Sequence, residues 1–390
     1  MNYHQWLLIA TMAITGMYAV SRKTKKGKLI CVIIMTVILT CFSGLRSWQM
    51  GDLFHYCHEF LVCNVPGWTL DLESVRSSVG LQLFLHAAGQ VGLSFENCLF
   101  IAAALVAVSL GVVVYRYSPS PYWSYVMFIS MGFFTWSFDI LKQAVAMAFI
   151  MFAVIPVMEK KLVWFIILVG LAAAFHPPAV MFALVYPFAH LPLKRGYFMI
   201  IAGLLLLVFL FRNDIVNWMA GLYYEEAARY EDAEFGSGRL LMMLAILALG
   251  LWLRPLKSFD KIYLKAFNIM VLAAAIQVFS IYDNVFTRLA NYLYQFVVIY
   301  IPMILQPGEE QKLLFPEHRG EIRSLSKELH YLGNAFVTAF AIWFYFRTVS
   351  PSVIAASQGY LSQFHFFWEV DSPSSLDLLE EYIQSSPLIG

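Results

Sequence analysis

Four segments of the sequence place charged or imidazole side chains directly beside long apolar runs. Arginine and lysine bind anions, and a carboxylate or an imidazole can accept a proton. A charge at the centre of a bilayer costs at least about 2.5–3.5 kcal/mol unless it faces a cavity or a partner. We therefore expect the polar groups of these segments to line one site: Arg46 and Asp52; Asp139, Lys142 and Gln143; His176; and Arg288, Tyr292 and Gln295.

The last of these segments carries the most specific pattern. Arg288, Tyr292 and Gln295 follow one another at steps of four and three residues, so they form one polar stripe on a helix. Each of the other groups also has a plainer interpretation. Arg46 could reach lipid phosphates from a helix end, Lys142 could pair only with Asp139, and a histidine at a helix terminus is often structural.

A fifth segment, residues 79–93, is too short to cross a bilayer. It spaces Gln82, His86 and Gln90 four residues apart on one face of an otherwise apolar helix. We expect this helix to lie in the membrane interface or to be re-entrant, either with His86 lining the site or as a plain amphipathic surface helix.

The composition indicates that these segments lie in a membrane protein. Of the 390 residues, 60% are hydrophobic and 13% charged, which is typical of a polytopic membrane protein. The net charge of +1 gives no sign of a nucleic-acid partner. We predict an all-α bundle of about twelve transmembrane spans, near residues 3–20, 29–45, 96–115, 122–138, 140–157, 162–176, 178–192, 197–212, 239–254, 263–281, 286–305 and 331–348.

Basic residues set the expected orientation. The loop SRKTKKGK, residues 21–28, follows the first apolar run and is strongly basic. Such loops stay on the cytoplasmic side, so the N-terminus is expected outside, and the alternation of spans places the C-terminus outside too. We expect one transmembrane domain over residues 1–349, with outer loops at 46–78 and 213–238, and an outward-facing tail at 350–390.

No metal or cofactor is predicted. His55, Cys57, His58 and Cys63 could in principle hold zinc, but their spacing matches no closed zinc pattern. Cys57 and Cys63 share one outer loop, so a disulfide between them is an alternative in an oxidising compartment. The sequence contains no phosphate-binding glycine loop, nucleophile elbow or HExxH helix.

The four segments, in this order, resemble the EpsG-like family of polysaccharide polymerases, which act like the Wzy-type polymerases of bacterial surface glycans. The resemblance rests on GLRSWQMGDLFHY, DILKQAVAMAFIMFA, LAAAFHPPAVMFALVYP and FTRLANYLYQFVVIYIPMIL. Two features depart from the family pattern. Lys142 stands where the family usually has arginine, and SSVG stands where it often has a glutamate.

The resemblance implies a glycosyltransferase of the bacterial cytoplasmic membrane. Its donor and acceptor would be polyprenyl diphosphate-linked glycans, with membrane lipids and a chain-length regulator or export machinery as further partners. The leaving diphosphate needs cations, which Arg46, Lys142 and Arg288 could supply without a metal. Asp52, Asp139 or His176 could take the proton of the acceptor hydroxyl. Substrate binding would also involve Gln143, Tyr292, Gln295 and His86.

Two other functions remain open. An integral-membrane acyltransferase would also gather histidine and arginine on one membrane face, but the sequence lacks a paired histidine motif and a second basic cluster for an acyl carrier. A transporter of lipid-linked glycans would need a polar path through the membrane and helices broken at mid-membrane.

Overall fold

The computed structural model describes residues 24–48, 52–72, 78–138, 140–193, 195–223, 237–253, 261–282, 285–305, 327–348, 366, 368 and 374–378. Regular structure in these residues is helical, apart from one isolated bridge between Arg46 and Phe366. The predicted all-α class is confirmed. The first predicted span, residues 3–20, lies outside the described residues.

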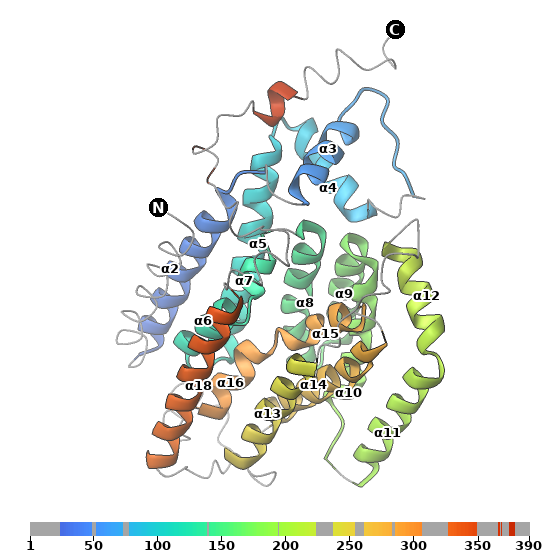
Figure 1. The fold of residues 1–390 in the computed structure, drawn as a ribbon. Coiled ribbons are helices and arrows are strands. Elements are labelled where there is room, and N and C mark those ends of the chain that lie inside the picture. Colours follow the sequence, from blue (N-terminus) through green and yellow to red (C-terminus); the bar gives the residue numbers. More distant parts are fainter. Residues whose placement is uncertain are drawn as a thin grey trace.

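Four described helices are long and apolar enough to cross a membrane. They are α2 (Lys25–Gly44), α5 (Phe95–Tyr117), α8 (Leu141–Glu159) and the continuous stretch Lys261–Ile281, which joins α14 (Lys261–Gln277) to η4 (Val278–Ile281). Thr24 and Ser94 begin α2 and α5 by accepting a backbone N–H from within the first turn. α2 packs against α5, α5 against α8, and α8 against α9 (Leu162–Phe175) (Figure 1).

Several predicted spans are broken, so the predicted twelve are not confirmed. The run 122–138 forms α6 (Pro121–Ser130) and α7 (Phe133–Trp136), separated at Gly132, whose φ of 80° is a left-handed conformation. The run 286–305 forms α15 (Val285–Tyr294) and α16 (Val297–Leu305), which bend by 48°. If each bent pair of helices counts as one span, the described residues contain six candidate spans.

The second bent pair is α11 (Arg195–Leu210) with α12 (Arg212–Tyr223), at 65°. The predicted span 178–192 is a 3-10 helix, η1 (Pro177–Leu184), followed by the short α10 (Val185–Ala189). Pro177 and Pro178 provide the reason, because neither can donate a backbone hydrogen bond to continue α9. The bundle is completed by α13 (Ser237–Leu253) and α18 (Lys327–Thr348).

Two short helices, α3 (Leu53–Cys63) and α4 (Val79–Gln90), cover one end of the bundle (Figure 1). We call this the α3–α4 end. α4 is the short helix predicted near residues 79–93. Its polar stripe contacts the end of α3 and the chain that follows it. Nδ1 of His86 lies 2.7 Å from the carbonyl of Cys63, and the Gln82 amide hydrogen bonds with both the N–H and the C=O of Asp71.

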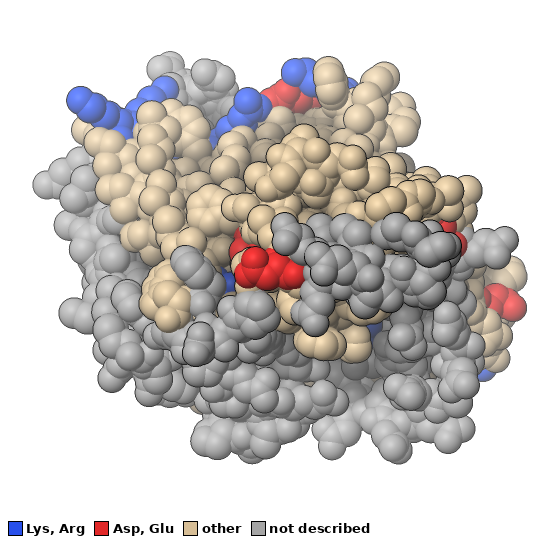
Figure 2. Space-filling model, turned by 90° about the horizontal axis from the view of Figure 1, so that it is seen from above, with Lys and Arg blue, Asp and Glu red and all other residues tan. Residues whose placement is uncertain are grey.

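The described parts of the C-terminal tail return to the same end. Phe366 pairs with Arg46 through the backbone bridge, and Ser375 contacts the start of α5. Seen from this end, the described lysines and arginines show mainly along one edge, while acidic side chains show near the centre and also at the edges (Figure 2).

Candidate functional site

A group of charged side chains meets beneath the α3–α4 end. Lys142, in the first turn of α8, interacts electrostatically with Glu59 of α3, with Asp52 just before α3, and with Arg288 of α15. His176, at the junction of α9 and η1, interacts electrostatically with both Lys142 and Arg288. We call these five residues the Lys142 cluster. It brings together four of the residues predicted from sequence and adds Glu59.

His176 is held in place by the polar stripe of α15. Nδ1 of His176 lies 2.5 Å from the Tyr292 hydroxyl, and the side chains are 1% exposed. The backbone N–H of His176 also donates to Ala172, and its carbonyl accepts from Ala179. The histidine therefore links the end of α9, the start of η1 and α15 at the point where the two prolines interrupt the helix.

The stripe continues toward α8, as its spacing predicts. The Gln295 amide donates to the carbonyl of Tyr292 at 3.1 Å and to that of Met147 at 3.5 Å. Arg239 of α13 donates to the Asn291 side chain at 2.6 Å, so a further arginine reaches α15 beside Tyr292.

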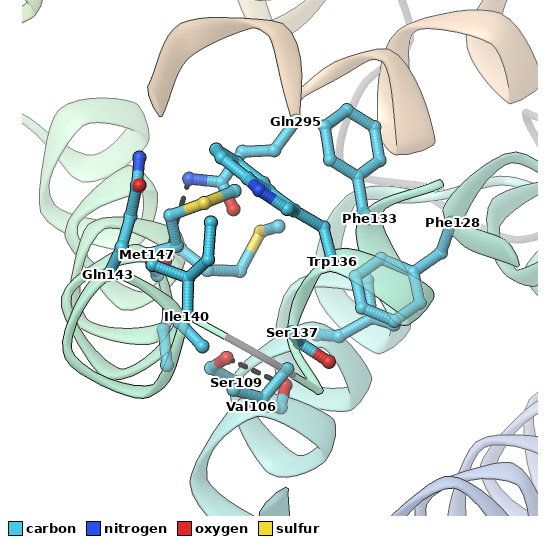
Figure 3. Close-up of a pocket in the computed structure, with 14 residues that line it drawn as sticks. Val106, Ser109, Phe128, Phe133, Trp136, Ser137, Ile140, Gln143, Met147 and Gln295 are labelled. Atoms are coloured by element: carbon cyan, nitrogen blue, oxygen red, sulfur yellow. Dashed lines mark hydrogen bonds between the residues drawn. The ribbon is translucent and has the colours of Figure 1, made fainter. Parts of the chain in front are cut away.

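Gln143 lies next to a small cavity in this region (Figure 3). Its side chain is buried, and neither amide atom has a hydrogen-bond partner among the described residues. The cavity, about 20 Å³, is also lined by Trp136, Met147 and Gln295. A space of this size holds about one water molecule, which could satisfy the Gln143 amide.

Arg46 is buried at the end of α2. Its Nε donates to the Phe138 carbonyl at 3.0 Å, and its Nη1 donates to the carbonyl and the hydroxyl of Ser43. The guanidinium also lies 5.9 Å from the centre of the Phe138 ring. Arg46 thus fastens α2 to the segment that leads into α8. Asp139, the next residue after Phe138, lies outside the described residues, so its role stays a prediction.

Glu59 is the member of the cluster that our sequence reasoning missed. Burial raises the pKa of this carboxyl to about 7, against the lowering effect of Lys142. Its Oε1 is buried without a hydrogen-bond partner among the described residues. The available signal was its spacing: Glu59 follows Asp52 by seven residues, which is two helical turns and therefore one helix face.

His86 and the cysteines lie around α3. The His86 ring stacks on Trp68, with centroids 4.3 Å apart. Cys57 and Cys63 are free thiols, and burial raises the pKa of each to about 12. His55 and His58 are exposed. In the described part of the chain, no three His, Cys, Asp or Glu side chains are grouped in a way that could hold a metal ion.

The long apolar helices are those of an integral membrane protein, and the partly buried Lys142 cluster lies between α3, α8, α9 and α15. Residues 29–315 match the EpsG family, so the chain belongs to this family, which contains polysaccharide polymerases similar to Wzy. No curated protein and no solved structure matches the chain.

Proposed function

We propose that the chain polymerises lipid-linked oligosaccharides into a surface polysaccharide or exopolysaccharide. It would transfer a glycan from a polyprenyl diphosphate to a hydroxyl of a second lipid-linked repeat unit, at the outer face of the bacterial cytoplasmic membrane. Membership of the family gives the reaction class. The observation that carries the proposal is the Lys142 cluster, because it joins two cations with carboxyl and imidazole groups from four separate chain segments.

The reaction breaks the bond between the anomeric carbon and the diphosphate oxygen and forms a bond from that carbon to the acceptor oxygen. Negative charge develops on the leaving diphosphate, and fixed cations in a water-poor site stabilise it strongly. Lys142 and Arg288 are the first candidates for this role because they lie together in the cluster. Arg46 already donates to Phe138 and Ser43, so we assign it mainly to positioning the start of α8.

The acceptor hydroxyl must lose a proton as the new bond forms. His176, Asp52 and Asp139 are the candidate bases. The hydrogen bond to Tyr292 supports His176, because it fixes the orientation of the imidazole ring beside the two cations. Gln143, Gln295 and His86 complete the set of groups that we propose to bind substrate.

One feature of the fold favours a second function, the transport of lipid-linked glycans. Transporters often carry helices broken within the membrane, with the substrate bound at the breaks. The apolar helices of this chain are interrupted at Gly132, which lies between α6 and α7, and at the bend between α15 and α16. The location of the Lys142 cluster beneath one end of the bundle favours polymerisation over a path through it.

The test is to incubate the purified chain, in lipid nanodiscs, with synthetic lipid-linked repeat units. We expect a ladder of longer products, and we expect Lys142→Ala to lower its rate of formation by about 10²–10³. Lys161→Ala is the matched control, because Lys161 is largely exposed and pairs with Glu159 outside the cluster. Absence of a ladder, together with movement of the lipid-linked unit across proteoliposomes, would favour transport instead.

A further inference from the structure

A second cavity opens at the α3–α4 end, between the end of α2, the start of α5 and the C-terminal tail. Its volume is about 420 Å³, which is within the range of sites for small organic ligands. The lining includes Arg46, Trp48, Glu96, Asn97 and Ser374. We call it the tail cavity.

Hydrogen bonds hold the tail against α5 at the edge of this cavity. The Ser375 hydroxyl accepts from the Phe95 N–H at 2.9 Å and donates to Oε2 of Glu96 at 2.5 Å. The Ser375 N–H donates to Oε1 of Glu96 at 3.2 Å. Leu378, one helical turn further, packs on the apolar cluster beneath α3 and α4. These contacts make the tail one wall of the cavity.

A second attachment lies on the α2 side. Phe366 pairs with the Arg46 backbone, and its ring stacks on that of Trp368 with centroids 4.5 Å apart and an angle of 5°. Trp368 is 56% exposed. Trp48, which is buried, lines the cavity from the residues that follow α2. The tail therefore brings an exposed aromatic ring to the segment that forms the cavity.

The chemistry of the lining selects a class of ligand. It combines a carboxylate, an amide and hydroxyl groups with aromatic rings, so it offers hydrogen bonds to a ligand rich in hydroxyls together with apolar faces. The Glu96 carboxylate repels an anion such as a diphosphate, so the lining favours an uncharged ligand. The Arg46 guanidinium is directed to Phe138 and Ser43.

We propose that the tail cavity binds a saccharide unit of the growing polymer, as a site separate from the one where transfer occurs. The inference rests on the proposed polymerisation. Arg46 connects the two regions, because it lines the cavity and its side chain also donates to the carbonyl of Phe138, just before α8. A bound saccharide would keep the product on the enzyme between successive transfers.

The test separates the first transfer from elongation. Asn97 is exposed in the first turn of α5 and lines the cavity, so Asn97→Trp fills the space without opening the core. Asn213, also exposed and in the first turn of α12, provides the matched control variant Asn213→Trp. With synthetic lipid-linked units, we expect Asn97→Trp to join two units at close to the normal rate but to give much shorter ladders. Asn213→Trp should give normal ladders.

Ser374→Trp fills the cavity from the tail and serves if Asn97→Trp does not fold. Normal ladders from the variant that folds would overturn the proposal.

A binding measurement distinguishes failure of this proposal from failure of the proposed polymerisation. The probe is an oligosaccharide fragment of the polymer made by the expressing cells, and saturation-transfer NMR detects its binding to the nanodisc protein. Because the Trp side chain fills the cavity and also removes a hydrogen-bonding group, binding should weaken by at least about five-fold in Asn97→Trp or Ser374→Trp. Equal binding by wild type and variant would refute the cavity site. Weakened binding without any ladder from wild type would retain the cavity site and reject polymerisation.

Discussion

Glu59→Gln is the substitution whose effect can be worked out most fully from the structure. The carboxyl lies in α3, partly buried, with Oε1 lacking a partner among the described residues and with Lys142 nearby. Glutamine keeps the size of the side chain and removes its charge. The change therefore isolates the cost of ionising this group in the folded protein.

The pKa gives the magnitude and the sign. Burial raises the Glu59 pKa from 4.5 to about 7. The folded state therefore keeps its proton at pH values where the unfolded state has lost it, and the free energy of unfolding falls as the pH rises from 4.5 through 7. At about 1.4 kcal/mol per pKa unit, and allowing for partial solvation, the loss above pH 7 is about 2–3 kcal/mol.

The assay is thermal unfolding of the nanodisc protein at pH 5 and pH 8. Relative to wild type, we expect Glu59→Gln to gain about 2–3 kcal/mol of stability on going from pH 5 to pH 8. Glu159→Gln is the control, because Glu159 pairs with Arg116 and Lys161 at a bundle end and its loss should cost about 1 kcal/mol or less. The same difference between Glu59→Gln and wild type at both pH values would refute the buried, protonatable carboxyl.

Further predictions concern the polymer ladder at matched membrane expression. Arg288→Lys should lower activity steeply because lysine cannot present the two parallel donors of arginine, and Arg46→Lys should do so through loss of its backbone contacts; wild-type ladders from both would reject these roles. Lys142→Arg should be tolerated, while Lys142→Ala should cost about 10²–10³ in rate; equal ladders from the two would reject a role for the charge. Tyr292→Phe should lower kcat more than it changes KM, because it frees the His176 ring, and an unchanged kcat would contradict this. A chelator should leave the activity intact. A loss of activity in chelator that is reversed by adding a divalent ion would show a metal requirement.

Sequence spacing predicts which residues lie on one helix face, but not which residues of other helices they meet. The steps of four and three along Arg288, Tyr292 and Gln295 predicted one helix face, and the structure places Tyr292 within α15 and Gln295 one residue beyond its end. The structure adds the partner, His176, which lies 116 positions earlier in the chain. The spacing of seven residues places Glu59 on the same helix face as Asp52, but it does not show the long-range electrostatic interaction with Lys142 of α8, which is why Glu59 was missed.

The number of spans could not be read from hydropathy. Residues 122–138 are apolar enough for one span, but Gly132 turns the chain and divides the run into α6 and α7. Apolar composition measures the preference for a nonpolar environment, whereas the direction of the chain depends on backbone conformation and on packing. The same limit applies to Arg46, whose partner is a backbone carbonyl that carries no sequence signal.

The length of α9 has a consequence for the surrounding lipid. Its 14 residues extend about 21 Å along the helix axis, which is less than the approximately 30 Å of a bilayer hydrocarbon core. Val163, Trp164 and Ile166 are 59–69% exposed, so this short helix presents an apolar surface. A bilayer adapts to a short apolar surface by thinning. The headgroup of a lipid-linked substrate would then sit closer to His176, at the end of α9, and thicker membranes would hold that headgroup further from the site.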